Sequence, residues 1–147
     1  MGRIVAIDYG KKRVGIAATD ELRIVANALE TFSPNEALAF LQRYVAAEKV
    51  DVMVVGKPIN LNGLPSEAAA GAANFTARLK KLFPQIEVAT FDERFTSRMA
   101  QQAIIDAGVK KKGRRDKELV DRVSACIILQ SYMDFLQNNI RNMEIAR

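Results

Sequence analysis

Residues 50–55 constrain the fold of this chain more than any other segment. They form a short, nearly continuous apolar run, Val-Asp-Val-Met-Val-Val, which is bounded by Gly56 and Pro58. Such a run is typical of a strand that is buried on both faces. A strand of this kind belongs at the centre of a sheet that helices cover on either side, which is the arrangement of an α/β domain.

The segments around this run predict strands first and then alternating helices and strands. Apolar runs at 3–9 and 13–19, separated by Gly-Lys-Lys, predict two antiparallel strands joined by a tight hairpin, and 24–29 predicts a third strand. Ser33-Pro34-Asn35-Glu36 has the form of a capping box, so a helix is expected from there to about Glu48.

The second half of the chain continues this alternation. We expect a helix over 66–83, a strand over 86–91, a helix capped by Thr96 that runs to Gly108, and a longest helix over 118–137. This order predicts one α/β domain with a mixed central sheet flanked by helices, over residues 1–138, followed by a C-terminal tail at 139–147.

The composition excludes several classes of enzyme. The chain has no histidine, which removes Ser-His-Asp and Cys-His nucleophile systems and the usual zinc-hydrolase ligand sets. The one cysteine, Cys126, lies in an apolar run and is expected in the core. No apolar stretch approaches the length of a membrane span, and the N-terminus lacks a signal-peptide core, so we expect a cytoplasmic protein that is not bound to a membrane.

Positive charge is concentrated in one segment. The formal net charge is +5, and residues 110–117, Lys-Lys-Lys-Gly-Arg-Arg-Asp-Lys, contain six basic residues and one acid, which is also +5. A local excess of this kind indicates an arm that binds a polyanion such as nucleic acid, although a solvated loop would have the same composition.

Carboxylates stand at three positions where an acid is awkward for folding alone. Asp8 ends a strand that is expected to be central, where an unpaired carboxylate is costly. Asp92 and Glu93 follow another buried strand, and Asp121 lies near the start of the last helix. Each acid has an alternative structural role: a turn cap for Asp8, an ion pair with a nearby arginine for Asp92 or Glu93, and stabilisation of the helix dipole for Asp121.

Two strand ends and a helix start can converge on one crevice at the carboxyl edge of an α/β sheet. Carboxylate oxygens in such a crevice suit Mg²⁺, which needs few protein ligands and also binds phosphate oxygens. Two such ions can activate a water and stabilise the leaving oxygen of a phosphodiester. The acids therefore predict a metal-dependent phosphodiesterase that acts on nucleic acid, with Mg²⁺ or Mn²⁺ as the cofactor.

Four stretches, IDYGKKRVGIAATD, VVGKPINLNG, FDERFTS and LVDRVSACIILQSYMDFL, resemble in order the signature stretches of the YqgF family of Holliday-junction-resolvase-like proteins. The resemblance implies a ribonuclease-H-like fold and nuclease processing of the 16S rRNA precursor at its 5′ end. It also implies that Asp8, Glu93 and Asp121 are the acidic triad. The chain departs from the pattern at Lys57, where an aliphatic residue is common, and at Arg122 and Ser124.

The expected nucleic-acid-binding residues are basic side chains close to these stretches: Lys11, Lys12, Arg13, Arg94, Arg98, Lys111, Lys112, Arg114 and Arg115. Asp92 and Glu118 are additional acids that could assist the triad.

Three other functions remain open from the sequence. Resolution of four-way DNA junctions would favour a homodimer with two active sites, whereas a monomer could trim an RNA precursor. A nucleotide-binding domain of the actin type would share the Asp-x-Gly turn and predicts stabilisation by ATP. A non-catalytic RNA-binding module would use the basic arm alone, but acids near a phosphate backbone weaken binding unless cations bridge them.

Overall fold

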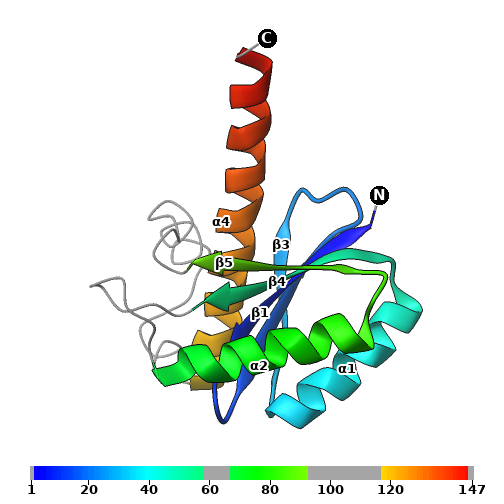
Figure 1. Ribbon diagram of the computed structural model, residues 1–147, viewed down its shortest axis with the longest axis vertical. Coiled ribbons are helices and arrows are strands. Elements are labelled where there is room, and N and C mark those ends of the chain that lie inside the picture. Colours follow the sequence, from blue (N-terminus) through cyan, green and yellow to red (C-terminus); the bar gives the residue numbers. More distant parts are fainter. Residues whose placement is uncertain (1, 58–66, 93–116, 146–147) are drawn as a thin grey trace.

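The computed structural model describes residues 2–57, 67–92 and 117–145, and side chains of the last helix are described from Val123 to Asn139. It contains a five-stranded sheet in the order β3-β2-β1-β4-β5 (Figure 1). The strands are β1 (Arg3–Tyr9), β2 (Val14–Thr19), β3 (Ala26–Phe32), β4 (Val50–Lys57) and β5 (Glu87–Asp92). β1, β4 and β5 are parallel, whereas β2 is antiparallel to β1 and β3. The prediction of a mixed central sheet is confirmed.

Strand β4 is buried on both faces, as its continuous apolar run predicted. Met53 and Val55 pack into one core of the protein, and Val52 and Val54 pack into the other. Side chains of a strand alternate between its two faces, so these two cores lie on opposite sides of the sheet.

Among the described residues, two helices cover one face of the sheet. α1 (Pro34–Ala47) and α2 (Glu67–Leu82) contribute Leu41 and Leu79, among others, to the core that contains Met53 and Val55. The cap predicted for α1 is present, because the Ser33 side chain accepts a hydrogen bond from the Glu36 N–H at 3.4 Å.

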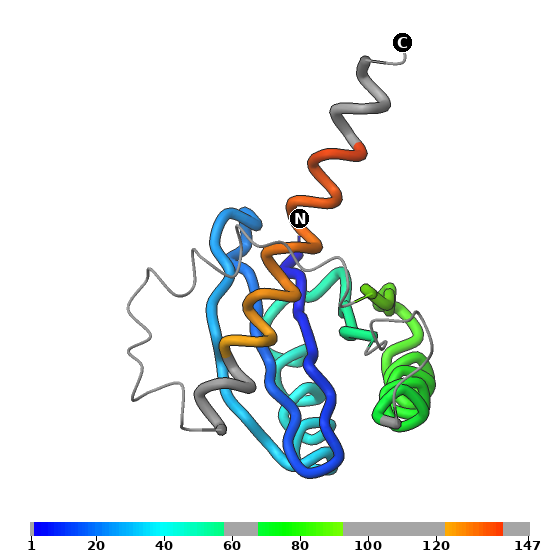
Figure 2. The backbone as a smooth tube through the Cα atoms, turned by 90° about the vertical axis from the view of Figure 1, so that its left-hand side faces the viewer, coloured from blue at the N-terminus to red at the C-terminus, as the bar shows by residue number. Residues whose placement is uncertain are grey.

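Helix α4 (Lys117–Ile145) covers the opposite face, where Ala125, Ile128 and Leu129 pack against the core that contains Val52 and Val54. The sequence predicted an end near Gln137, but the helix continues to Ile145, into the predicted tail, and projects beyond the sheet (Figures 1 and 2). No helix in the described part of the chain is long and apolar enough to cross a membrane.

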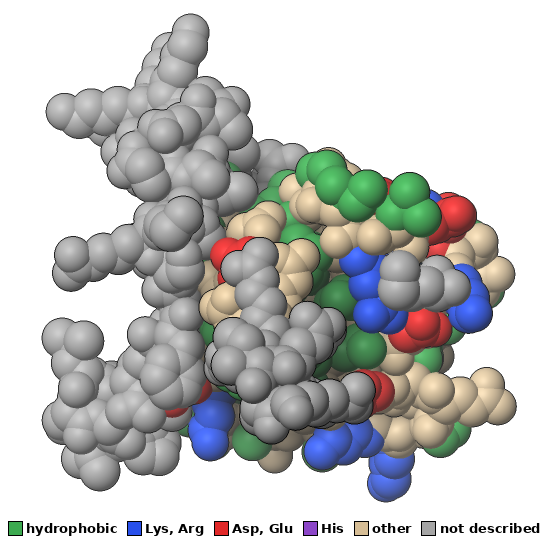
Figure 3. Space-filling model, turned by 90° about the horizontal axis from the view of Figure 1, so that it is seen from above, with side chains coloured by type: hydrophobic (Ala, Val, Ile, Leu, Met, Phe, Trp, Pro, Cys, Tyr) green, Lys and Arg blue, Asp and Glu red, His purple; other side chains and the backbone are tan. Residues whose placement is uncertain are grey.

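The predicted bounds of the third strand, 24–29, are wrong, since β3 covers Ala26–Phe32. The Asp20 carboxylate accepts hydrogen bonds from the N–H groups of Ile24 and Val25 at 2.7 and 2.8 Å, which holds these residues in the β2–β3 turn. Their side chains, with that of Leu22, are exposed, and Figure 3 shows hydrophobic side chains on the surface at this end of the molecule.

The hairpin between β1 and β2 is also slightly longer than predicted. The second strand begins at Val14, not Arg13, and Tyr9 pairs with Val14 across a four-residue turn of Gly10, Lys11, Lys12 and Arg13. A Cβ atom on Gly10 would lie 2.7 Å from the Arg13 carbonyl oxygen, so the turn requires glycine at this position.

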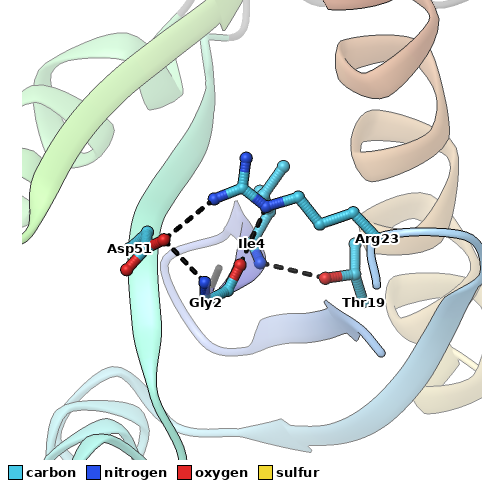
Figure 4. Close-up of polar contacts among 5 residues, drawn as sticks. All are labelled: Gly2, Ile4, Thr19, Arg23 and Asp51. Atoms are coloured by element: carbon cyan, nitrogen blue, oxygen red, sulfur yellow. Dashed lines mark hydrogen bonds and ion pairs between the residues drawn. The ribbon is translucent and has the colours of Figure 1, made fainter. Parts of the chain in front are cut away.

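A polar cluster joins three segments at the end of the sheet where β1 begins (Figure 4). The Asp51 carboxylate accepts hydrogen bonds from the Gly2 N–H at 2.7 Å and from the Arg23 guanidinium at 3.1 Å. Arg23 Nε also donates to the Gly2 carbonyl oxygen at 2.8 Å. The cluster fixes the β2–β3 turn, in which Arg23 has a positive φ of 56°, against the start of β1 and β4.

Candidate active site at the carboxyl edge of the sheet

The three parallel strands end at the same edge of the sheet, and each brings a charged residue there. Ile7 of β1 pairs with Val55 of β4, and Asp8 is the next residue of β1. Lys57, the last residue of β4, pairs with Asp92, the last residue of β5. Ligands of α/β proteins bind outside this carboxyl edge, so Asp8, Lys57 and Asp92 mark the first region to consider.

Strand alternation places Asp8 and Asp92 on opposite faces of the sheet. Asp8 follows the alternation of Ile4 and Ala6, which face α4, whereas Phe91 is the residue of β5 that faces α4. Asp92 therefore lies on the face covered by α1 and α2. Asp8 is half-buried, and both carboxylates have interactions within the structure.

Helix α4 brings the position of Asp121 to the same side of the sheet as Asp8. Residues 121, 125, 128 and 132 lie on one face of the helix because an α-helix repeats every 3.6 residues. Ala125, Ile128 and Tyr132 are buried against the sheet, so the backbone of Asp121 continues the sheet-facing stripe. The helix begins near the end of the sheet where β1 turns into β2 (Figure 1). Asp8 lies at this end because it immediately precedes Tyr9, the last residue of β1.

Basic side chains lie close to Asp8 along the chain. Lys11 and Lys12 are exposed in the β1–β2 turn, and Arg13 is half-buried beside them. Lys57 is exposed at the end of the neighbouring strand β4, on the face of the sheet opposite to Asp8. Lys57 was not among the predicted binding residues, although its position directly after a buried strand was a sequence signal that could have identified it.

Several predicted site residues cannot be placed. Glu93, Arg94, Arg98, Lys111, Lys112, Arg114 and Arg115 lie outside the described residues, as does the predicted helix over 96–108. The backbone of Asp121 is described as part of α4, but its side chain is not. Likewise, the backbone of Glu118 is described in the first turn of α4, but its side chain is not.

Asp8 is the member of the predicted acidic triad whose side chain the structure describes. Within the described part of the chain, no group of three or more His, Cys, Asp or Glu side chains could hold a metal ion. Asp8 supplies carboxylate oxygens in a half-buried position, and Mg²⁺ and Mn²⁺ prefer such oxygen ligands.

Cys126 takes no part in this chemistry. It is buried behind the site on α4, and burial raises the pKa of its thiol to about 11. The thiol is therefore protonated at neutral pH, whereas the thiolate is the form that attacks substrates and binds metals. The chain also lacks histidine, so at neutral pH neither this thiol nor an imidazole is available as a nucleophile or a metal ligand.

The sequence has clear relatives. A family model named RuvX, with the description Holliday junction resolvase, matches residues 2–135. A protein of Porphyromonas gingivalis named "Putative pre-16S rRNA nuclease" is 51% identical over 134 residues, which are 91% of this chain and 97% of that protein. A protein of the same name from Flavobacterium psychrophilum is 47% identical over 133 residues, or 90% of this chain and 97% of that protein.

The fold is similar to that of solved RuvC structures. Thermus thermophilus RuvC, in a structure with a Holliday junction substrate, aligns with 92% of this chain and 96% of its own at a TM-score of 0.58 and 14% identity. A second T. thermophilus RuvC structure aligns with 90% of this chain and 96% of its own at a TM-score of 0.53. The predicted ribonuclease-H-like fold is thereby confirmed.

Proposed function

The chain belongs to the RuvX family of Holliday junction resolvase-like proteins, and from this premise we propose that it is a metal-dependent endonuclease of the 16S rRNA precursor. The observation that carries the proposal is the placement of Asp8 and residue 121 on the two layers that face each other. Asp8 lies on the α4-facing side of the central strand, and residue 121 continues the sheet-facing stripe of α4.

We propose Glu93 as the third acid because it directly follows Asp92, the last residue of β5 at the carboxyl edge, and because the resemblance of the stretch FDERFTS implies this role for it. Asp8, Glu93 and Asp121 would then hold one or two divalent cations as oxygen ligands. Bound Mg²⁺ or Mn²⁺ supplies water activation and stabilisation of the leaving oxygen.

The protein's own residues have two further roles in this proposal. Lys11, Lys12 and Arg13 would hold the phosphate backbone beside Asp8, since cations at a polyanion site bind by releasing counterions. Gly10 allows the tight turn that carries Lys11, Lys12 and Arg13.

The test is cleavage of matched substrates by the purified protein. Fragments of the 16S rRNA precursor, unrelated single-stranded RNA and four-way DNA junctions would each be incubated with Mg²⁺, Mn²⁺, Ca²⁺ or excess EDTA. We expect specific cleavage of the precursor with Mg²⁺ or Mn²⁺ and little with Ca²⁺. Equal cleavage in EDTA, by a preparation free of contaminating nuclease, would exclude metal-dependent hydrolysis.

Asp92 provides a matched control for the assignment of Asp8. Both residues are carboxylates at strand ends on the same edge, but they lie on opposite faces of the sheet. Asp8→Asn should abolish cleavage, and Asp92→Asn should leave it within a few-fold of the wild type. Loss of activity in Asp92→Asn alone would move the site to the α2 face.

The second candidate function is resolution of four-way DNA junctions, which the family description and the similarity to RuvC favour. It requires two cuts related by symmetry and therefore predicts a dimer with two sites on the junction. Analytical ultracentrifugation with and without the junction distinguishes it from RNA trimming, which a monomer can perform. Cleavage of the junction in preference to the rRNA precursor would select this alternative.

The basic segment 110–117 is proposed to bind the nucleic-acid backbone. Replacing Lys111, Lys112, Arg114 and Arg115 by Ser should weaken binding and flatten its salt dependence, because fewer counterions are released. An unchanged salt slope would identify the segment as a solvated loop.

A further inference from the structure

A separate cavity lies on the face of the sheet opposite to Asp8. It has a volume of about 260 Å³, lies between α2 and the carboxyl ends of β4 and β5, and is open to solvent on one side. Thr90 of β5 and Lys57 of β4 line it, and both follow the strand alternation of the α2 face. The cavity and the candidate metal site therefore share one edge of the sheet but lie on different faces.

The floor of this cavity is apolar and built from small side chains. It consists of Ala69, Ala72 and Ala73 of α2 together with Val55 and Gly56 of β4. Alanine and glycine leave an even surface without projecting groups. A flat ring can contact such a surface over most of its area, which is how an apolar pocket binds an aromatic ligand.

Polar groups of two kinds surround this floor. Lys57 and Lys80 are exposed, and in the described ranges no carboxylate forms an ion pair with either ammonium group. Asp92, the partner of Lys57 in the β-ladder, does not line the cavity. Thr76 donates its hydroxyl to the Ala72 carbonyl at 2.8 Å, so its oxygen remains able to accept a hydrogen bond.

We propose that this cavity binds one nucleotide, with the base against the alanine floor and the phosphate at Lys57 and Lys80. Two cations attract an anion, and the apolar floor accepts the ring to which the anion is attached. The volume is below the ~300 Å³ at which pockets for whole small molecules begin, so a base fits inside while its phosphate stays at the rim.

The nucleotide could be a free mononucleotide or one unit of an RNA strand, since both present the same base and phosphate. In the second case the cavity would hold a part of the substrate away from the cleaved bond, and that reading depends on the proposed function. The binding site itself does not, because it is independent of the metal and lies on the other face of the sheet.

Binding would be measured by NMR and fluorescence anisotropy on the full-length chain in excess EDTA, so that cleavage cannot occur. The probes are AMP, a short oligoribonucleotide and inorganic phosphate. We expect AMP, the oligonucleotide or both to shift the amide signals of α2 between Ala69 and Lys80 and that of Thr90. A response to AMP identifies a free nucleotide as a ligand, and a response to the oligonucleotide alone identifies a strand.

Two pairs of variants separate this cavity from the surrounding surface. Ala73→Leu places a larger side chain at a position that lines the cavity, whereas Ala70→Leu places the same side chain on α2 outside it, and both positions are exposed. Lys80→Gln removes a cation from the rim, and Lys81→Gln removes the exposed neighbouring charge that does not line the cavity. Thermal melts of all four variants confirm that each is folded.

We expect Ala73→Leu to abolish binding and Lys80→Gln to weaken it about fivefold, the effect of one exposed ion pair. Lys80→Gln should also reduce the salt slope for the oligonucleotide by about 0.7, the value for one contact to a single strand. The two control variants should bind like the wild type.

Three results would overturn the proposal. The first is the absence of any shift on α2 with AMP and with the oligonucleotide. The second is equal weakening by each variant and its control. The third is competition by inorganic phosphate as effective as that by AMP, which would show an anion site without a place for the base. Loss of cleavage in the nuclease assay would leave all of these measurements unaffected.

Discussion

Gly71 of α2 connects helix packing with the position of Asp8. A Cβ atom at Gly71 would lie 2.6 Å from Cε1 of Tyr9, closer than real Cβ contacts, and 3.1 Å from its hydroxyl oxygen, which is tighter than most of them. Tyr9 directly follows Asp8 in β1, and its ring packs on Phe75 with a centroid distance of 5.2 Å. Gly71→Ala must therefore displace a ring that α2 already holds on a second side.

Two opposing terms decide the effect of Gly71→Ala on stability. Replacing glycine by alanine inside a helix raises the free energy of unfolding by about 1 kcal/mol. Overpacking of a filled site costs about 1–3 kcal/mol. The net expectation is a loss of about 1 kcal/mol in the free energy of unfolding, or a fall of about 2–4 °C in Tm. Cleavage should fall under conditions in which the variant is fully folded, because displacement of Tyr9 also moves Asp8.

A double-mutant cycle tests this reasoning. In the Tyr9→Ala background the ring is absent, so Gly71→Ala should become stabilising by about 1 kcal/mol. Ala70→Gly, at an exposed position of the same helix, calibrates the propensity term independently. The measurements are urea unfolding curves of each variant. A gain in stability from Gly71→Ala in the presence of Tyr9, or a coupling energy near zero, would refute the proposed clash.

Three further predictions concern charged and ionisable groups. Without metal, Asp8→Asn should raise the free energy of unfolding by about 1 kcal/mol, because clustered carboxylates repel one another. Mg²⁺ should raise the Tm of the wild type more than that of the variant. A variant that melts several degrees lower yet still cleaves would show that Asp8 has a structural role. The pKa of Asp51 is lowered in the folded state, first by the hydrogen bond from the Gly2 N–H and then by the charges of Lys49 and Arg23. The contribution of Asp51 to stability should therefore be present above about pH 4 and disappear as pH falls through the lowered pKa. Urea unfolding at pH 7 and pH 3 should show a larger loss for the wild type than for Asp51→Asn, and equal losses would contradict this. Cys126 is buried and the pKa of its thiol is raised, so a thiol reagent at pH 8 should react with it only as fast as the protein opens. Rapid labelling of the folded protein would disprove that the thiol is shielded.

The fold was predictable where the pattern of apolar residues reported burial directly. The run at 50–55 identified β4 because a strand covered on both faces needs apolar residues at nearly every position. The predicted position of β3 was wrong because β3 is an edge strand, and much of it is exposed and therefore carries few apolar residues. The apolar pair Ile24 and Val25 gave a stronger strand pattern than the true strand Ala26–Phe32. The turn that holds them depends on the side chain of Asp20, which apolar periodicity cannot reveal.

The candidate site was predictable only in part, for a similar reason. Strand ends and a helix start were enough to suggest that Asp8 and Asp121 approach one edge. The face on which each acid lies needed the register of the strands, which separated Asp92 from Asp8. The cavity under α2 could not be predicted at all, because Lys57 and Lys80 are brought together only by the packing of α2 on β4.

The position of α4 at the end of the element order affects how the protein is made on the ribosome. β4 ends at Lys57 and α4 begins at Lys117, 60 residues later, which takes about 3–12 s to synthesise at ~5–20 residues per second. During that interval the apolar face formed by Ile4, Ala6, Val52 and Val54 still lacks α4, the helix that covers it in the described part of the chain. The nascent sheet is then at its most vulnerable to aggregation. In the proposed site the carboxylate of Asp8 likewise awaits α4, so we expect the nascent chain to stay inactive until α4 has been translated.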